Sequence, residues 1–133
     1  MYDENIISRM NDYLHKAAQA LASWLSVMLP KSGEDWWEEG GLSNLSYPQR
    51  ELIEKKGLSK LEELDLAALL RVANKSWYTM RGYAYLPTSE RECIRDMIGV
   101  RNNWAHVSAE LPGKDTIVSD IECLIRFFTQ MNR

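Results

Sequence analysis

The chain has 133 residues, of which 45% are hydrophobic and 26% are charged, and its formal net charge is −3. This length suits a single domain, residues 1–133, with one core, and the acidic balance argues against a protein that coats nucleic acid by bulk electrostatics. No apolar run reaches the roughly 18 residues of a membrane-spanning helix, and Asp3 and Glu4 stand where a signal peptide needs basic residues. We therefore expect a cytoplasmic protein with no membrane association.

The first predicted element is a long amphipathic helix over residues 3–28. Its apolar stripe advances in alternating steps of three and four residues through Ile7, Met10, Leu14, Ala17, Leu21, Trp24 and Met28. The stripe is widened on one side by Ile6, Tyr13, Ala20 and Val27. Pro30 ends this helix. His15 lies off the stripe, so we expect it to face solvent and assign it no role.

Residues 30–46 are predicted to form a loop that contains Trp36 and Trp37 among acidic residues. Two adjacent tryptophans either cap the end of a helical core or form a patch for a partner, and we favour the cap. A short helix is expected from Pro48, at its first position, to Lys56, with Gly57 ending it.

Three further helices are predicted in the second half of the chain. One begins at Ser59 or Asp65 and continues to Gly82, with an apolar stripe formed by Leu66, Leu69, Leu70, Ala73, Trp77 and Met80. The next starts at Thr88 or Ser89 and ends near His106. The last is capped by Asp115 and has core spacing at Ile117, Val118, Ile121, Leu124, Ile125 and Phe128. Since no segment alternates as a strand does, the predicted fold is all-α, an antiparallel bundle of four to five helices.

The two cysteines, Cys93 and Cys123, lack the spacing of metal ligands and each lies in a helical pattern. We expect both to be reduced, partly buried thiols. No metal site and no cofactor are expected.

The segment 101–106 places a permanent cation on an apolar stripe. Ile94, Met97 and Ile98 lead by helical spacing to Arg101, where a guanidinium is costly unless it is paired or faces another surface. His106, the side chain best suited to proton transfer near neutral pH, follows five residues later. The other interpretation is structural: Arg101 extends to solvent or pairs with an acid such as Asp96, and His106 only ends the helix.

The surroundings of this segment favour phosphate binding. Residues 71–106 carry six basic and three acidic side chains, although the whole chain is acidic. On one ideal helix, Arg101 and His106 lie about 140° apart, so a single copy makes a poor catalytic cleft. We therefore expect a symmetric homodimer in which two copies of the segment line one groove.

Segment 101–106 resembles the Arg-polar-x3-His motif of the HEPN superfamily, which contains small helical nucleases and nucleotide-binding domains. Segments 65–71, 98–102 and 115–116 are similar to one branch of it, and the resemblance covers roughly residues 3–131. That branch accompanies a eukaryotic nuclear messenger-RNA surveillance endoribonuclease and also occurs at the N-termini of large bacterial ATPases, helicases and phage-defence proteins.

The resemblance implies that Arg101 and His106 are a catalytic pair and that Asn102 is the polar residue that orients them. It further implies a metal-independent endoribonuclease that works as a dimer, acts on RNA and serves in phage defence or toxin-type RNA restriction. Its chemistry would be attack of a ribose 2′-hydroxyl on the adjacent phosphate. The alternative is a non-catalytic dimerisation or regulatory module of a larger ATPase or helicase, with the chain as its N-terminal domain. A neighbouring antitoxin would instead indicate a free-standing toxin.

Overall fold

The computed structural model describes residues 4–105 and 110–132, and these residues form helices and turns without a strand. The helices that form the bundle are α1 (Glu4–Met28), α3 (Leu66–Lys75), α5 (Thr88–Ala105) and α6 (Lys114–Met131). The shorter helices are α2 (Tyr47–Lys56) and α4 (Trp77–Arg81), together with the brief turns η1 (Leu29–Ser32), η2 (Trp37–Gly41), η3 (Leu42–Asn44) and η4 (Leu61–Glu63). The predicted all-α helical bundle is confirmed.

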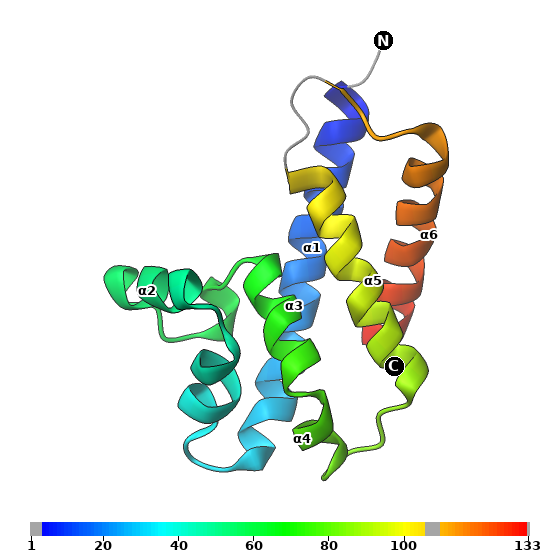
Figure 1. Ribbon diagram of the computed structural model, residues 1–133. Coiled ribbons are helices and arrows are strands. Elements are labelled where there is room, and N and C mark those ends of the chain that lie inside the picture. Colours follow the sequence, from blue (N-terminus) through cyan, green and yellow to red (C-terminus); the bar gives the residue numbers. More distant parts are fainter. Residues whose placement is uncertain (1–3, 106–109, 133) are drawn as a thin grey trace.

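The bundle is built around α1, which packs against α3, α5 and α6. Helix α5 runs in the opposite direction to α1, α3 and α6, and α2 projects from the side of the bundle (Figure 1). The core is formed where the four helices meet, by side chains that include Leu21, Leu69, Ile94, Met97 and Phe127. No helix in residues 4–105 or 110–132 is both long and apolar enough to cross a bilayer.

The predicted apolar stripe of α1 faces the core, with Met10, Ala17, Leu21 and Met28 buried and the rest of the stripe partly buried, but the predicted widening lies on the wrong side. Ala17, Leu21 and Leu25 are fully buried, whereas Tyr13 and Val27 are exposed. The neighbouring helices cover the other flank of the stripe, where Ala22 and Leu25 lie. Periodicity gives the centre of a buried face, while its width depends on where the neighbouring helices pack.

The single helix predicted to end at Gly82 is interrupted at Ser76, which separates α3 from α4. Ser76 is only 2% exposed, and its hydroxyl donates to the carbonyl of Gly40 (3.0 Å) and accepts from Asn44 Nδ2 (2.9 Å). The backbone of Ser76 departs from ideal helix geometry, with φ −87° and ψ 0°, while its amide still donates to the carbonyl of Val72. The interruption therefore ties the loop before α2 to the bundle.

That loop contributes to the core. Trp36 and Trp37 are half-buried, pack against the core, and meet edge to face with ring centroids 5.9 Å apart. This arrangement supports the interpretation of the pair as a cap on the core. Helix α2 begins after the loop with a reciprocal capping box between Ser46 and Gln49. It ends, as predicted, at Gly57, whose φ of +66° is a conformation that glycine adopts without strain.

Helix α6 buries only one side. Asp120, Cys123, Leu124 and Phe127 are buried, whereas Val118, Ile121 and Ile125, which have core spacing, are exposed. Among the described residues of one chain, the helices that pack against α6 are α1 and α5, and both lie on its buried side. The predicted cap is also wrong, because α6 begins at Lys114 after Gly113 and no side chain caps it.

Cys93 of α5 and Cys123 of α6 are buried and form no disulfide. Although they are far apart in the sequence, their thiols are hydrogen-bond partners across the α5–α6 interface. The hydrogen bond to Cys93 and burial both raise the pKa of Cys123 above the usual thiol value. The same interaction lowers the pKa of Cys93. Both thiols are free, as expected, and they are more completely buried than the partial burial that the sequence predicts.

Candidate functional site

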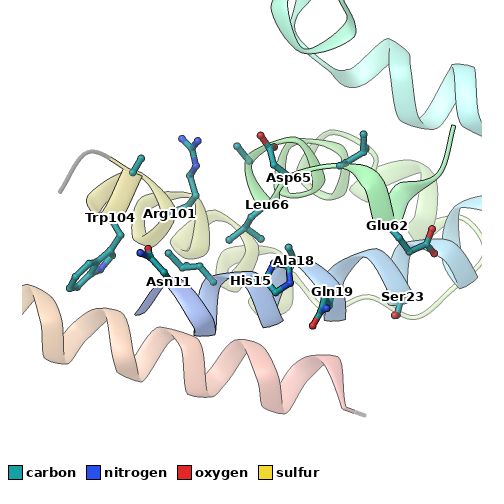
Figure 2. Close-up of a pocket in the computed structure, with 14 residues that line it drawn as sticks. Asn11, His15, Ala18, Gln19, Ser23, Glu62, Asp65, Leu66, Arg101 and Trp104 are labelled. Atoms are coloured by element: carbon teal, nitrogen blue, oxygen red, sulfur yellow. The ribbon is translucent and has the colours of Figure 1, made fainter. Parts of the chain in front are cut away.

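A groove of about 580 Å³ lies between α1, the start of α3 and the end of α5. Its floor follows α1 from Asn11 to Ser23, a rise of about 18 Å at 1.5 Å per residue. Figure 2 shows Arg101 and Trp104 at one end of the groove and Glu62 at the other, with His15 between them on α1. The groove is therefore long enough for an extended ligand and carries opposite charges at its two ends.

Arg101 projects from α5 at the groove and is partly buried. Its only hydrogen bond among the described residues is a long one, from Nη1 to Asn102 Oδ1 at 3.4 Å. Asp96, the acid that could have neutralised it, lies instead 3.7 Å from Arg126. Since no carboxylate in residues 4–105 or 110–132 forms an ion pair with Arg101, its charge is left to face the groove.

Asn103 and Trp104 hold the end of α5 in place. Trp104 Nε1 donates to Asp120 Oδ2 at 2.8 Å, and Asn103 Nδ2 lies 3.2 and 3.3 Å from the two oxygens of the same carboxylate. Asp120 and Trp104 are each 5% exposed, so this bond lies in the interior between α5 and α6. A buried carboxylate needs such donors to offset its lost hydration. The bonds consequently fix the backbone from which Arg101 and Asn102 project.

The Swt1-like HEPN family model matches residues 11–130, which is most of the chain. The chain belongs to the Swt1-like HEPN family. Comparisons with curated proteins and with solved structures found no significant match. HEPN domains are often RNases, so the family makes RNA cleavage or nucleotide binding the relevant classes of function for this chain.

The HEPN motif is divided between two surfaces of α5. Arg101 and Trp104 line the groove, while Asn102 is exposed and lines a smaller pocket that shares Arg101. The structure thus brings Arg101 and Asn102 into contact. His106, the third predicted site residue, lies outside the described residues. The catalytic role of all three remains a prediction.

His15, to which the sequence analysis assigns no role, is exposed as expected and lines the groove of this HEPN domain. It was set aside because it falls outside the apolar stripe of α1. The signal that could have found it is a second, polar stripe with four-residue spacing, formed by Asn11, His15, Gln19 and Ser23. Every member of that stripe lines the groove. No cluster of three or more metal-ligating side chains occurs in the part of the chain that the structure describes.

Proposed function

We propose that this HEPN domain is a metal-independent endoribonuclease that acts in the cytoplasm, in phage defence or toxin-type RNA restriction. The observation that carries the proposal is the position of Arg101: a partly buried guanidinium with no acidic partner in the described chain, at the end of a groove, within the family motif. A guanidinium in this position is suited to bidentate binding of phosphate oxygens.

The proposed reaction is transesterification within the RNA strand. The ribose 2′-oxygen attacks the adjacent phosphorus, the bond from phosphorus to the 5′-oxygen breaks, and the products are a 2′,3′-cyclic phosphate and a 5′-hydroxyl. Arg101 opposes the negative charge that develops on the non-bridging oxygens, and Asn102 orients the guanidinium. His106 acts as general base or general acid, a role worth about 10²- to 10⁴-fold in rate.

The domain is proposed to act as a homodimer in which the two copies of the motif line one cleft. The separation of about 140° between Arg101 and His106 on an ideal helix favours a composite site. Light scattering at micromolar concentration tests this point. A dimer supports the composite site, whereas a strict monomer at high concentration contradicts it.

The deciding experiment is an RNA cleavage assay in EDTA with the wild type, Arg101→Ala, His106→Ala and His15→Ala. We expect cleavage by the wild type that leaves cyclic phosphate ends, little or none by the Arg101 and His106 variants, and no cleavage of DNA. Equal rates for wild type and His106→Ala would refute the proposal. His15→Ala identifies which of the two histidines in the chain accounts for any pH dependence.

The alternative function is a non-catalytic dimerisation or regulatory module of a larger ATPase or helicase. It predicts a wild-type dimer that cleaves no RNA in the same assay, even at high protein concentration. The acidic net charge of −3 favours this alternative, because bulk electrostatics do not draw RNA to the domain.

A further inference from the structure

A second hollow, the basic pocket, adjoins the groove and shares Arg101 and Ala67 with it. The basic pocket measures about 180 Å³ and lies between α3, the C-terminal half of α5 and the start of α2. Its polar lining comprises Gln49, Arg71, Asn74, Lys75, Arg101 and Asn102. Three of these side chains are cations and none is a carboxylate, so the basic pocket is strongly positive within an acidic protein.

The three amide side chains of the basic pocket also present donors. In each of them the amide oxygen already accepts a hydrogen bond. Gln49 Oε1 accepts from the backbone amide of Ser46 at 2.9 Å, and Asn74 Oδ1 accepts from Arg91 Nε at 3.2 Å. Asn102 Oδ1 accepts from Arg101 Nη1 at 3.4 Å. Each of these oxygens thus has a partner within the protein, and each amide also carries an NH2 group that can donate. Every polar side chain that lines the basic pocket is therefore a donor, which is an arrangement suited to an anion and unsuited to a cation.

Arg71 is positioned in advance of any ligand. Its Nε donates to the backbone carbonyl of Asn44 at 2.9 Å, so the guanidinium is held at one edge of the basic pocket. The two Nη groups have no hydrogen-bond partner among the described residues and can bind two oxygens of one anion. Anchoring through Nε reduces the side-chain entropy lost when a ligand binds.

We propose that the basic pocket binds a phosphate group, namely that of the nucleotide next to the one cleaved in the groove. Its volume of about 180 Å³, about six times the volume of one water molecule in the liquid, has room for a phosphate group. Because Arg101 borders both hollows, a strand whose scissile phosphate meets Arg101 places a neighbouring phosphate within reach of Arg71 and Lys75. This inference rests on the proposed function for the identity of the strand.

The test measures binding of a single-stranded RNA whose riboses are 2′-O-methylated, so that it cannot be cleaved. Lys75→Met is compared with Lys55→Met, a matched control, since both lysines are exposed and both lie in the last turn of a helix. We expect Lys75→Met to raise the Kd about tenfold and Lys55→Met to leave it within about twofold. The slope of log affinity against log salt should fall by about 0.7 for Lys75→Met alone, the value for one lost phosphate contact on a single strand.

Equal Kd values and equal salt slopes for the two lysine variants would overturn the phosphate site. Inorganic phosphate is titrated separately: if Lys75→Met weakens its binding but leaves RNA binding unchanged, the basic pocket takes free phosphate and its assignment to the RNA strand is wrong. The two proposals fail in different ways. A wild type that cleaves no RNA, yet binds it through Lys75, refutes only the nuclease. If the wild type cleaves RNA but Lys75→Met and Lys55→Met bind RNA with the same Kd, only the phosphate site in the basic pocket is refuted.

Discussion

Asp120→Ala removes the buried carboxylate that holds the end of α5, and we expect a large loss of stability. Trp104 Nε1 would be left buried without its acceptor, and a hydrogen bond to a charged group contributes about 1.5–3 kcal/mol. Asn103 is exposed and can turn to water, so its bonds add little. The free energy of unfolding should fall by about 2–3 kcal/mol. For a domain of 133 residues this lowers the Tm by about 7–11 °C.

Thermal unfolding followed by circular dichroism measures this loss. Glu122→Ala is the control, because Glu122 is exposed on the same helix and its removal should stay within about 0.5 kcal/mol. Trp104→Phe removes the donor of the same hydrogen bond and should also lower the Tm, since it leaves the Asp120 carboxylate buried without its best donor. If Asp120→Ala melts within 2 °C or so of Glu122→Ala, the buried bond does not hold α5 and our explanation of the motif's position is wrong.

Three further predictions concern single side chains. Arg101→Ala should retain the helical circular dichroism spectrum and change the free energy of unfolding by less than about 0.5 kcal/mol, because Arg101 forms no ion pair within the described chain. A Tm loss as large as that of Asp120→Ala would show that Arg101 has a structural role. Tyr83→Phe should stabilise the protein by up to about 1 kcal/mol in urea unfolding, because Tyr83 Oη is buried without a hydrogen-bond partner among the described residues. Burial also raises the pKa of Tyr83. A clear loss of stability in this variant would show that the hydroxyl has a partner. Because the fold raises the pKa of Cys123, the stability that this thiol contributes should be full below the ordinary thiol pKa near 9 and be lost as pH rises above it. Cys123→Ala should therefore flatten the decline in stability above pH 9. An equal decline in wild type and Cys123→Ala would show that the thiol is not protected by the fold.

Helical periodicity was sufficient to predict the elements of the bundle and most of its core. The stripe through Leu69, Leu70 and Ala73 is fully buried, as is most of the stripe through Ala17 and Leu21. Local chemistry was equally informative at Gly57, where a left-handed residue ends α2. These features depend on residues close together in the chain, and short-range patterns report them well.

Features that depend on how the helices pack could not be predicted in this way. The exposure of Val118 and Ile125 follows from the absence of a neighbouring helix on that side of α6, which a periodic pattern does not reveal. His15 acquires its place in the groove only because α3 and α5 lie beside α1. Likewise, the hydrogen bond from Trp104 to Asp120 joins residues sixteen positions apart, and a tryptophan or an aspartate in the sequence does not indicate which residue it will bind.

The packing of α1 against α6 has a consequence for how the domain is made. Synthesis proceeds from the N-terminus, so α1 leaves the ribosome about a hundred residues before its last partner. During that interval the side of α1 that ends against α6 can only be covered by transient contacts or by a chaperone. Within this domain, α1 therefore cannot complete its packing until α6 has been made. Nascent chains stalled before Lys114 should remain sensitive to proteases, and protection should arise only once α6 is complete.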